Sequence, residues 1–180
     1  MLYPAPVRDL LLSLAEIGLY HARWTDAIQQ EWVNRLVINR PDILLAKLQR
    51  TTELMARAIP DSKVVGYESL IRSLVLPDPD DRHVLAAAIA GHADAIVTFN
   101  TRDFPAEYLA QYDIETQHPD DFVMNQFELH ELSAIAAVKA MRSRLRNPPQ
   151  SVADLAGTLD RITLPQTASY LRRAEIVRLI

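Results

Sequence analysis

The sequence predicts an α/β fold in which a parallel sheet is flanked by helices, followed by a helical appendage. A run at helical spacing, Val84 to Ala90, leads through Gly91 into a short apolar strand at 95–97. Such a helix, tight turn and buried strand form the repeating unit of open parallel sheets. After residue 128 only helical patterns remain. We therefore expect one α/β domain over 1–127 and an appendage over 128–180.

In the first half of the chain, the sequence pattern predicts helices joined by short extended segments. An amphipathic helix from Pro4 to about Glu16 carries Leu10 and Leu14 on one face. Thr25 or Asp26 is the expected N-cap of the next helix, on which Trp32 lies. Beyond it the pattern predicts a helix over 41–58, a short strand at 64–65 and an irregular segment over 69–76.

In the second half, proline and capping residues set the expected boundaries. Prolines 77 and 79 disfavour helix for the residues before them, so the central helix begins at about Asp80. The remaining expected elements are a helix at 106–112, a weak strand at 113–116, and helices at 119–127, 131–146, 151–159 and from Pro165 onward. The basic residues of the 131–146 helix form either a solvated face or a surface for a partner.

Composition restricts the class of protein. The 180 residues, 49% of them hydrophobic, suffice for a buried core. There is no cysteine, which excludes disulfides, thiolate zinc sites and a cysteine nucleophile. No apolar stretch reaches the roughly 20 residues of a membrane span, so we expect a cytoplasmic protein that does not enter membranes. The net charge of −4 argues against nucleic-acid binding by charge alone, but not against a nuclease whose acids hold metal ions.

Two polar clusters border the central helix and strand. The first runs from Pro77 to His83 and the second from Thr98 to Phe104. Ligands of parallel sheets gather beyond the carboxyl ends of the strands, so the two clusters are expected to converge there. Carboxylate and amide oxygens suit Mg²⁺ or Mn²⁺. An aspartate at a helix N-terminus is more often a cap than a ligand, and Asp80 and Asp81 are open to both interpretations.

These residues carry a resemblance to a known family. The segments Leu76-Pro77-Asp78-Pro79-Asp80-Asp81-Arg82-His83-Val84-Leu85-Ala86-Ala87-Ala88 and Ile96-Val97-Thr98-Phe99-Asn100-Thr101-Arg102-Asp103-Phe104-Pro105 resemble the second half of a PIN domain. The branch that they resemble includes the VapC-like toxins of bacterial toxin–antitoxin pairs. The resemblance extends over about residues 2 to 125. It implies a PIN-like three-layer fold with four or five parallel strands.

The resemblance also implies a function and a set of site residues. Active members are metal-dependent ribonucleases, so it implies an Mg²⁺- or Mn²⁺-dependent endoribonuclease, with RNA as substrate and an antitoxin protein as partner. A homodimer is left open. By position, the catalytic residues are Glu31, Asp81, Asn100 and Asp103, and the metal ligands are Glu31, Asp80, Asp81 and Asp103. The expected contacts for RNA or a partner are Arg82, Thr98 and Arg102.

One departure bears on activity. The family places a strand that ends in an aspartate just before the segment that matches Leu2-Tyr3-Pro4, where this sequence has Met1. We therefore expect either a start site assigned too late or a relative impaired by loss of that acid. Two alternatives stay open: a catalytically inactive PIN-like module that binds a partner, and an unrelated Mg²⁺-dependent phosphoesterase built from the same acids.

Overall fold

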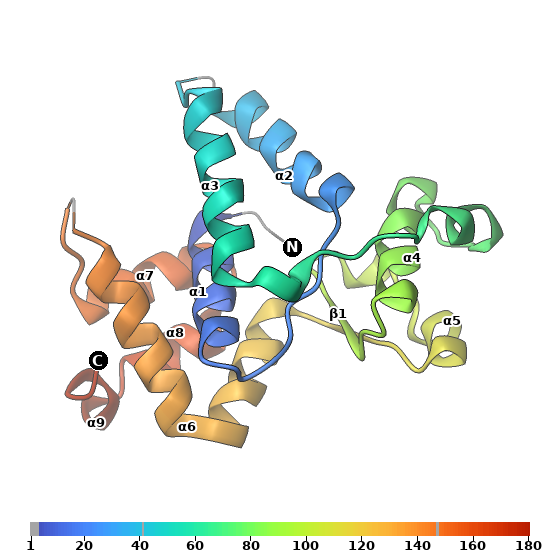
Figure 1. The fold of residues 1–180 in the computed structure, drawn as a ribbon. Helices are drawn as coiled ribbons and strands as arrows, with labels where there is room; N and C mark the ends of the chain where they lie inside the picture. The colour runs from blue at the N-terminus through green and yellow to red at the C-terminus, as the bar shows by residue number, and fades with distance from the viewer. Residues whose placement is uncertain (1–3, 41, 147) are drawn as a thin grey trace. The chain divides into compact units, whose positions relative to one another are not determined.

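The computed structural model describes residues 4–40, 42–146 and 148–180, and it is dominated by helices (Figure 1). Within these ranges the α-helices and strands are α1 (Ala5–Glu16), α2 (Asp26–Asn39), α3 (Leu45–Ala58), α4 (Arg82–Ala90), β1 (Ala95–Val97), α5 (Ala106–Leu109), β2 (Glu115–Gln117), α6 (Pro119–Arg144), α7 (Val152–Arg161), α8 (Pro165–Leu171) and α9 (Ala174–Val177). The expectation about Met1 lies outside the described residues.

The chain forms two compact units. The first unit comprises residues 22–118, and the second joins the N-terminal helix to residues 119–180. In the second unit α1 packs against α6, although more than a hundred residues separate them in the sequence. These units group residues by their contacts and do not define domains, so the expected domain boundary after residue 127 stays a prediction.

In the second unit, α1 forms where the sequence predicts it. Prolines are favoured in a first turn, and here Pro6 occupies that position. Val7, Leu10 and Leu14 are fully buried. The two helices expected over 119–127 and 131–146 are joined as α6 across a kink at His130, whose φ of −146° and ψ of 65° are not helical. Both predicted helices are therefore present, the break between them falls at His130, and the second helix ends at Arg144.

The basic residues of α6 make contacts within the second unit. Arg142 donates hydrogen bonds to the backbone oxygens of Gln150 and Ile180. Arg144 forms an ion pair with Glu16 at 2.9 Å. Both side chains connect α6 to other parts of the same unit, so Arg142 is not simply solvated, whereas Arg144 remains exposed as the solvated-face interpretation expects.

In the first unit, a small parallel sheet confirms the predicted fold class, but among the described residues it has two strands and not the four or five that the resemblance implies. Strands β1 and β2 pair in register, with Ala95 opposite Glu115 and Val97 opposite Gln117. The second strand begins later than expected, because Asp113 has a left-handed backbone conformation with φ of 56° that ends the preceding turn. The strand expected at 64–65 is reduced to a single parallel bridge between Trp24 and Lys63.

The core of the first unit surrounds α4. Leu85 and Ala86 of this helix are fully buried and pack with Ile96 of β1 and Leu109 of α5. The helix ends at Gly91, where a Cβ would lie 2.8 Å from Val64 Cγ2, so only glycine permits this close approach. Packing thus fixes α4 beside β1, and the polar segments at their ends lie near each other.

The structure also bears on the helix expected from Pro41 and on the expected absence of a membrane-spanning helix. The helix predicted from Pro41 begins at Leu45, and Pro41 itself lies outside the described residues. In the parts of the chain that the structure describes, no helix combines the length and apolar character needed to cross a membrane.

Candidate functional site

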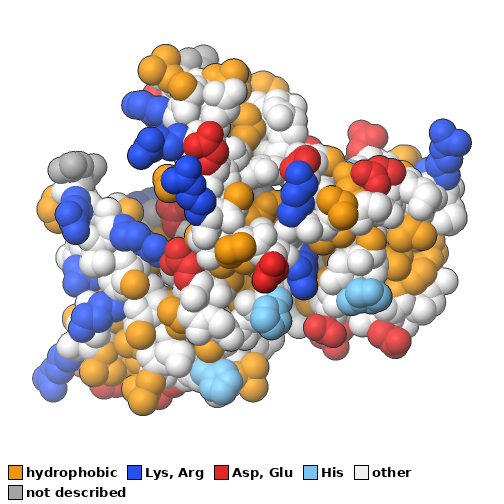
Figure 2. Space-filling view, in the orientation of Figure 1, with side chains coloured by type: hydrophobic (Ala, Val, Ile, Leu, Met, Phe, Trp, Pro, Cys, Tyr) orange, Lys and Arg blue, Asp and Glu red, His pale blue; other side chains and the backbone are white. Residues whose placement is uncertain are grey.

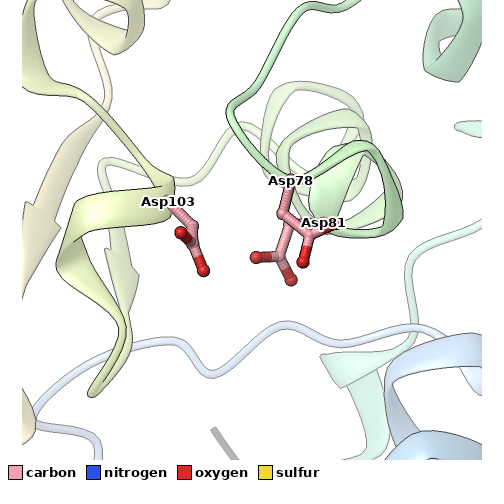
Figure 3. Close-up of side chains that lie close together, drawn as sticks. All are labelled: Asp78, Asp81 and Asp103. Carbon is pink, nitrogen blue, oxygen red and sulfur yellow. The ribbon is translucent and has the colours of Figure 1, made fainter.

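Three aspartates converge at one end of the first unit. Asp78, Asp81 and Asp103 each offer a carboxylate oxygen, and these oxygens all lie within 4.8 Å of one another. Figure 3 shows Asp78 and Asp81 projecting together from the segment before α4, with Asp103 facing them from the loop that follows β1. We call these three residues the aspartate cluster. It joins the two polar segments as the sequence predicts.

Local backbone structure places Asp78 and Asp81 on the same side. Pro79 keeps Asp78 extended, with φ of −99° and ψ of 115°, and a 3₁₀ helix (Pro79–Asp81) follows. One carboxylate oxygen of Asp78 accepts a hydrogen bond from the backbone N–H of Asp80 at 2.9 Å. The turn therefore brings residues 78 and 81 together and leaves Asp80 exposed, outside the aspartate cluster. The expected role of Asp80 as a ligand stays a prediction.

Asp103 is oriented by its neighbour. It ends a short 3₁₀ helix (Thr101–Asp103), and the side-chain amide of Asn100 donates a hydrogen bond to its Oδ2. The backbone N–H of Asn100 in turn donates to Thr98 Oγ1 at 3.1 Å. Asn100 thus contacts Asp103 directly, and the hydroxyl of Thr98 orders the loop that carries both.

The pKa of Asp81 is raised to about 6. The main cause is burial of the carboxyl, and the carboxylates of Asp103, Asp78 and Glu31 add to it. His83 acts in the opposite direction. Crowded carboxylates repel one another, and a bound cation relieves that repulsion. Three carboxylates with no nitrogen or sulfur donor form the ligand type that Mg²⁺ or Mn²⁺ prefers, so the donor set fits such an ion.

The other residues predicted for the site lie outside the aspartate cluster. Glu31 lies on α2, with Oε1 2.7 Å from His83 Nε2, and it is not part of the aspartate cluster. Arg82 begins α4 with its Nε buried, and Arg102 is exposed. The predicted contacts of Arg82, Thr98 and Arg102 with RNA or a partner stay predictions.

Sequence reasoning missed two residues of this region. Asp78 was expected only as part of the first polar cluster, and His83 was assigned no role. The signal for Asp78 was its spacing of three residues from Asp81 across Pro79, which a 3₁₀ turn brings to one side. No local signal indicated His83, because its contact lies on a helix 52 positions earlier in the chain.

The fold is α/β and rich in helices, and the acidic site lies beyond the end of a parallel strand. These two features place the chain among candidate metal-dependent proteins. Comparison with family models narrows this class: the chain belongs to the PIN domain family, whose model matches residues 3–102. A second model, described as the VapC50 C-terminal domain, matches residues 119–173. This membership leaves the alternative of an unrelated phosphoesterase without support.

A curated protein of Mycobacterium tuberculosis (strain ATCC 25618 / H37Rv), named "Putative ribonuclease VapC50", is 38% identical over 108 residues. The match covers 60% of this chain and 63% of that protein, so the chain spans somewhat less than two thirds of the length of the relative. No solved structure matches the chain.

Proposed function

We propose that this chain is a divalent-metal-dependent endoribonuclease that acts as the toxin of a bacterial toxin–antitoxin pair. The observation that carries the proposal is the aspartate cluster, since its oxygens lie within 4.8 Å of one another on a PIN domain. The similarity to a protein named as a putative ribonuclease also supports this activity. An RNA substrate, an antitoxin partner and a cytoplasmic location belong to this proposal, and self-association remains an outcome to be measured.

In the proposed mechanism, Asp78, Asp81 and Asp103 would hold Mg²⁺ or Mn²⁺. When bound, such an ion lowers the pKa of a water and stabilises the leaving oxygen of a phosphodiester. Asn100 keeps the Asp103 carboxylate oriented through the amide hydrogen bond, so the ligand geometry is set before substrate arrives. The carboxylates also repel a phosphate unless a cation offsets their charge, which makes RNA binding at this site depend on the metal.

Positive charge elsewhere in the first unit supports a polyanionic substrate. Lys47, Arg50 and Arg57 are exposed on α3 at positions that share one face of the helix. Figure 2 shows Lys and Arg side chains over this helix. Cations of this kind bind phosphates regardless of sequence. They would compensate in part for the acidic balance of the domain.

The test measures metal binding and RNA cleavage separately. Mn²⁺ affinity is determined by electron paramagnetic resonance for the wild-type chain and for the variants Asp78→Asn, Asp81→Asn and Asp103→Asn. Cleavage of a mixed RNA pool is followed in the same buffers. Asp94→Asn is the matched control, because Asp94 is an exposed aspartate of the same unit outside the cluster.

The proposal predicts that each cluster variant weakens Mn²⁺ binding and abolishes cleavage, while Asp94→Asn changes neither. Tight Mn²⁺ binding without cleavage of any RNA would favour the inactive partner-binding module. Cleavage that persists in all three cluster variants, or that needs no divalent ion, contradicts the proposal.

A further inference from the structure

His83 and Glu31 form a contact between two helices beside the aspartate cluster. His83 lies in the first turn of α4, two residues after Asp81, and Glu31 lies on α2. His83 Nε2 is 2.7 Å from Glu31 Oε1. The histidine side chain is only 13% exposed, whereas that of Glu31 is 57% exposed. A nearly buried imidazole therefore holds one oxygen of a glutamate that otherwise extends into solvent.

This contact decides where the glutamate points. A glutamate on a helix surface samples several rotamers, and losing that freedom opposes ordered metal binding. The contact with His83 uses Oε1 and does not use Oε2, and the Glu31 carboxylate is close enough to Asp81 to contribute to the raised pKa of that carboxyl. Both ring nitrogens of His83 are buried, and within the described part of the chain neither makes a hydrogen bond of regular geometry. The close approach of Nε2 to Glu31 Oε1 is therefore an ion-pair contact.

We propose that His83 is a positioning residue that holds the Glu31 carboxylate toward the aspartate cluster, so that Glu31 Oε2 serves as a fourth ligand oxygen. This inference rests on the proposed metal-dependent function. Groups that hydrogen-bond to ligating carboxylates commonly fix their orientation, and removing them weakens metal binding. The imidazole N–H does not point straight at Oε1, and such bonds often align only when the site is loaded.

A structural contact between α2 and α4 would have the same appearance but different consequences. A purely structural role ties His83 to folding stability and leaves the metal site unaffected. A positioning role ties His83 to metal affinity, and only while Glu31 is present to be positioned. The two roles are therefore separated by measuring both quantities in single and double variants.

The experiment uses Mn²⁺ alone as the probe, with affinity measured by electron paramagnetic resonance and the thermal midpoint measured in EDTA. The variants are His83→Gln, His83→Leu, Glu31→Gln and the double variant His83→Leu/Glu31→Gln. The amide nitrogen of glutamine reaches as far as Nε2 of histidine, so His83→Gln keeps a donor to Glu31. His92→Asn is the control, because His92 is an exposed histidine of the same unit with φ of 50°, which asparagine tolerates.

We expect His83→Leu to weaken Mn²⁺ binding by roughly 10- to 100-fold, as for other residues that orient ligands. We expect His83→Gln to restore most of the affinity. In the Glu31→Gln background, His83→Leu should add no further loss. Unchanged Mn²⁺ affinity in His83→Leu, an equal loss with and without Glu31, or no Mn²⁺ binding by the wild-type chain would each overturn the proposal. Failure of the ribonuclease proposal is distinguishable, because it leaves the Mn²⁺ pattern intact while no RNA is cleaved.

Discussion

Neutralising Asp81 should stabilise the metal-free protein while destroying its site. Burial, and then the neighbouring carboxylates, raise the pKa of Asp81 from its ordinary value of 3.8 to about 6. Below pH 3.8 the carboxyl is protonated in both the folded and unfolded states, so it imposes no penalty on folding. As the pH rises through about 6, the folded state must ionise a group that its surroundings disfavour. The folded protein therefore loses stability between these pH values.

The size of this effect follows from the pKa change. Each pKa unit corresponds to about 1.4 kcal/mol, so the full difference gives an upper limit of about 3 kcal/mol. Asp81 is only partly buried, and screening by solvent reduces this to about 1 kcal/mol. For a chain of this length, 1 kcal/mol corresponds to a change in thermal midpoint of roughly 2–4 °C. We expect Asp81→Asn to raise the midpoint by that amount at pH 7 in EDTA, and by almost nothing at pH 4.

The assay is thermal unfolding of the wild-type chain, Asp81→Asn and the control Asp94→Asn, at both pH values and with or without Mn²⁺. Saturation at 100 times the Kd stabilises the folded state by about 2.7 kcal/mol, so Mn²⁺ should raise the midpoint of the wild-type chain above that of Asp81→Asn. The order of the two midpoints should thus reverse on adding metal. A lower midpoint for Asp81→Asn in EDTA at pH 7, or equal shifts at both pH values, would refute this reasoning.

Three further predictions concern packing, capping and charge. Leu85→Ala should lower the free energy of unfolding by about 2–5 kcal/mol in urea titrations, because Leu85 is fully buried in the core of the first unit. Asp120→Ala should cost about 3 kcal/mol in the same assay, since this buried carboxylate accepts three hydrogen bonds from the start of α8, and Asp120→Asn should cost less. The triple variant Lys47→Ala/Arg50→Ala/Arg57→Ala should reduce the salt dependence of single-stranded RNA binding by about 2 in the log–log slope, with Mn²⁺ affinity unchanged. An unchanged slope would assign these cations to a solvated face.

Local sequence patterns predicted the elements well where short-range chemistry decides them. Thr25 caps α2, with its side chain accepting from the backbone N–H of Ile28. Ser151 and Asp154 form the expected capping box at the start of α7. Pro77 and Pro79 delay the central helix, which begins at Arg82. These outcomes depend on backbone geometry and hydrogen bonds within a few residues, so they can be predicted without knowing the rest of the fold.

Local patterns were less informative where an element depends on its neighbours. The strand expected at 64–65 has a single bridge, because pairing needs a partner segment and the sequence of one strand does not specify it. The role of Arg142 was missed for the same reason, as its acceptors lie 8 and 38 residues further along the chain.

For the candidate site, the sequence by itself determined which residues can offer ligand oxygens and that two polar segments border one helix and one strand. Only the tertiary structure decided that Asp78, rather than Asp80, joins Asp81 and Asp103, and that Glu31 contacts His83. The physical reason is that residue type and helix or strand propensity are local properties. The distance between two side chains depends on how α2, α4 and β1 pack, and packing is decided by apolar surfaces far apart in the sequence.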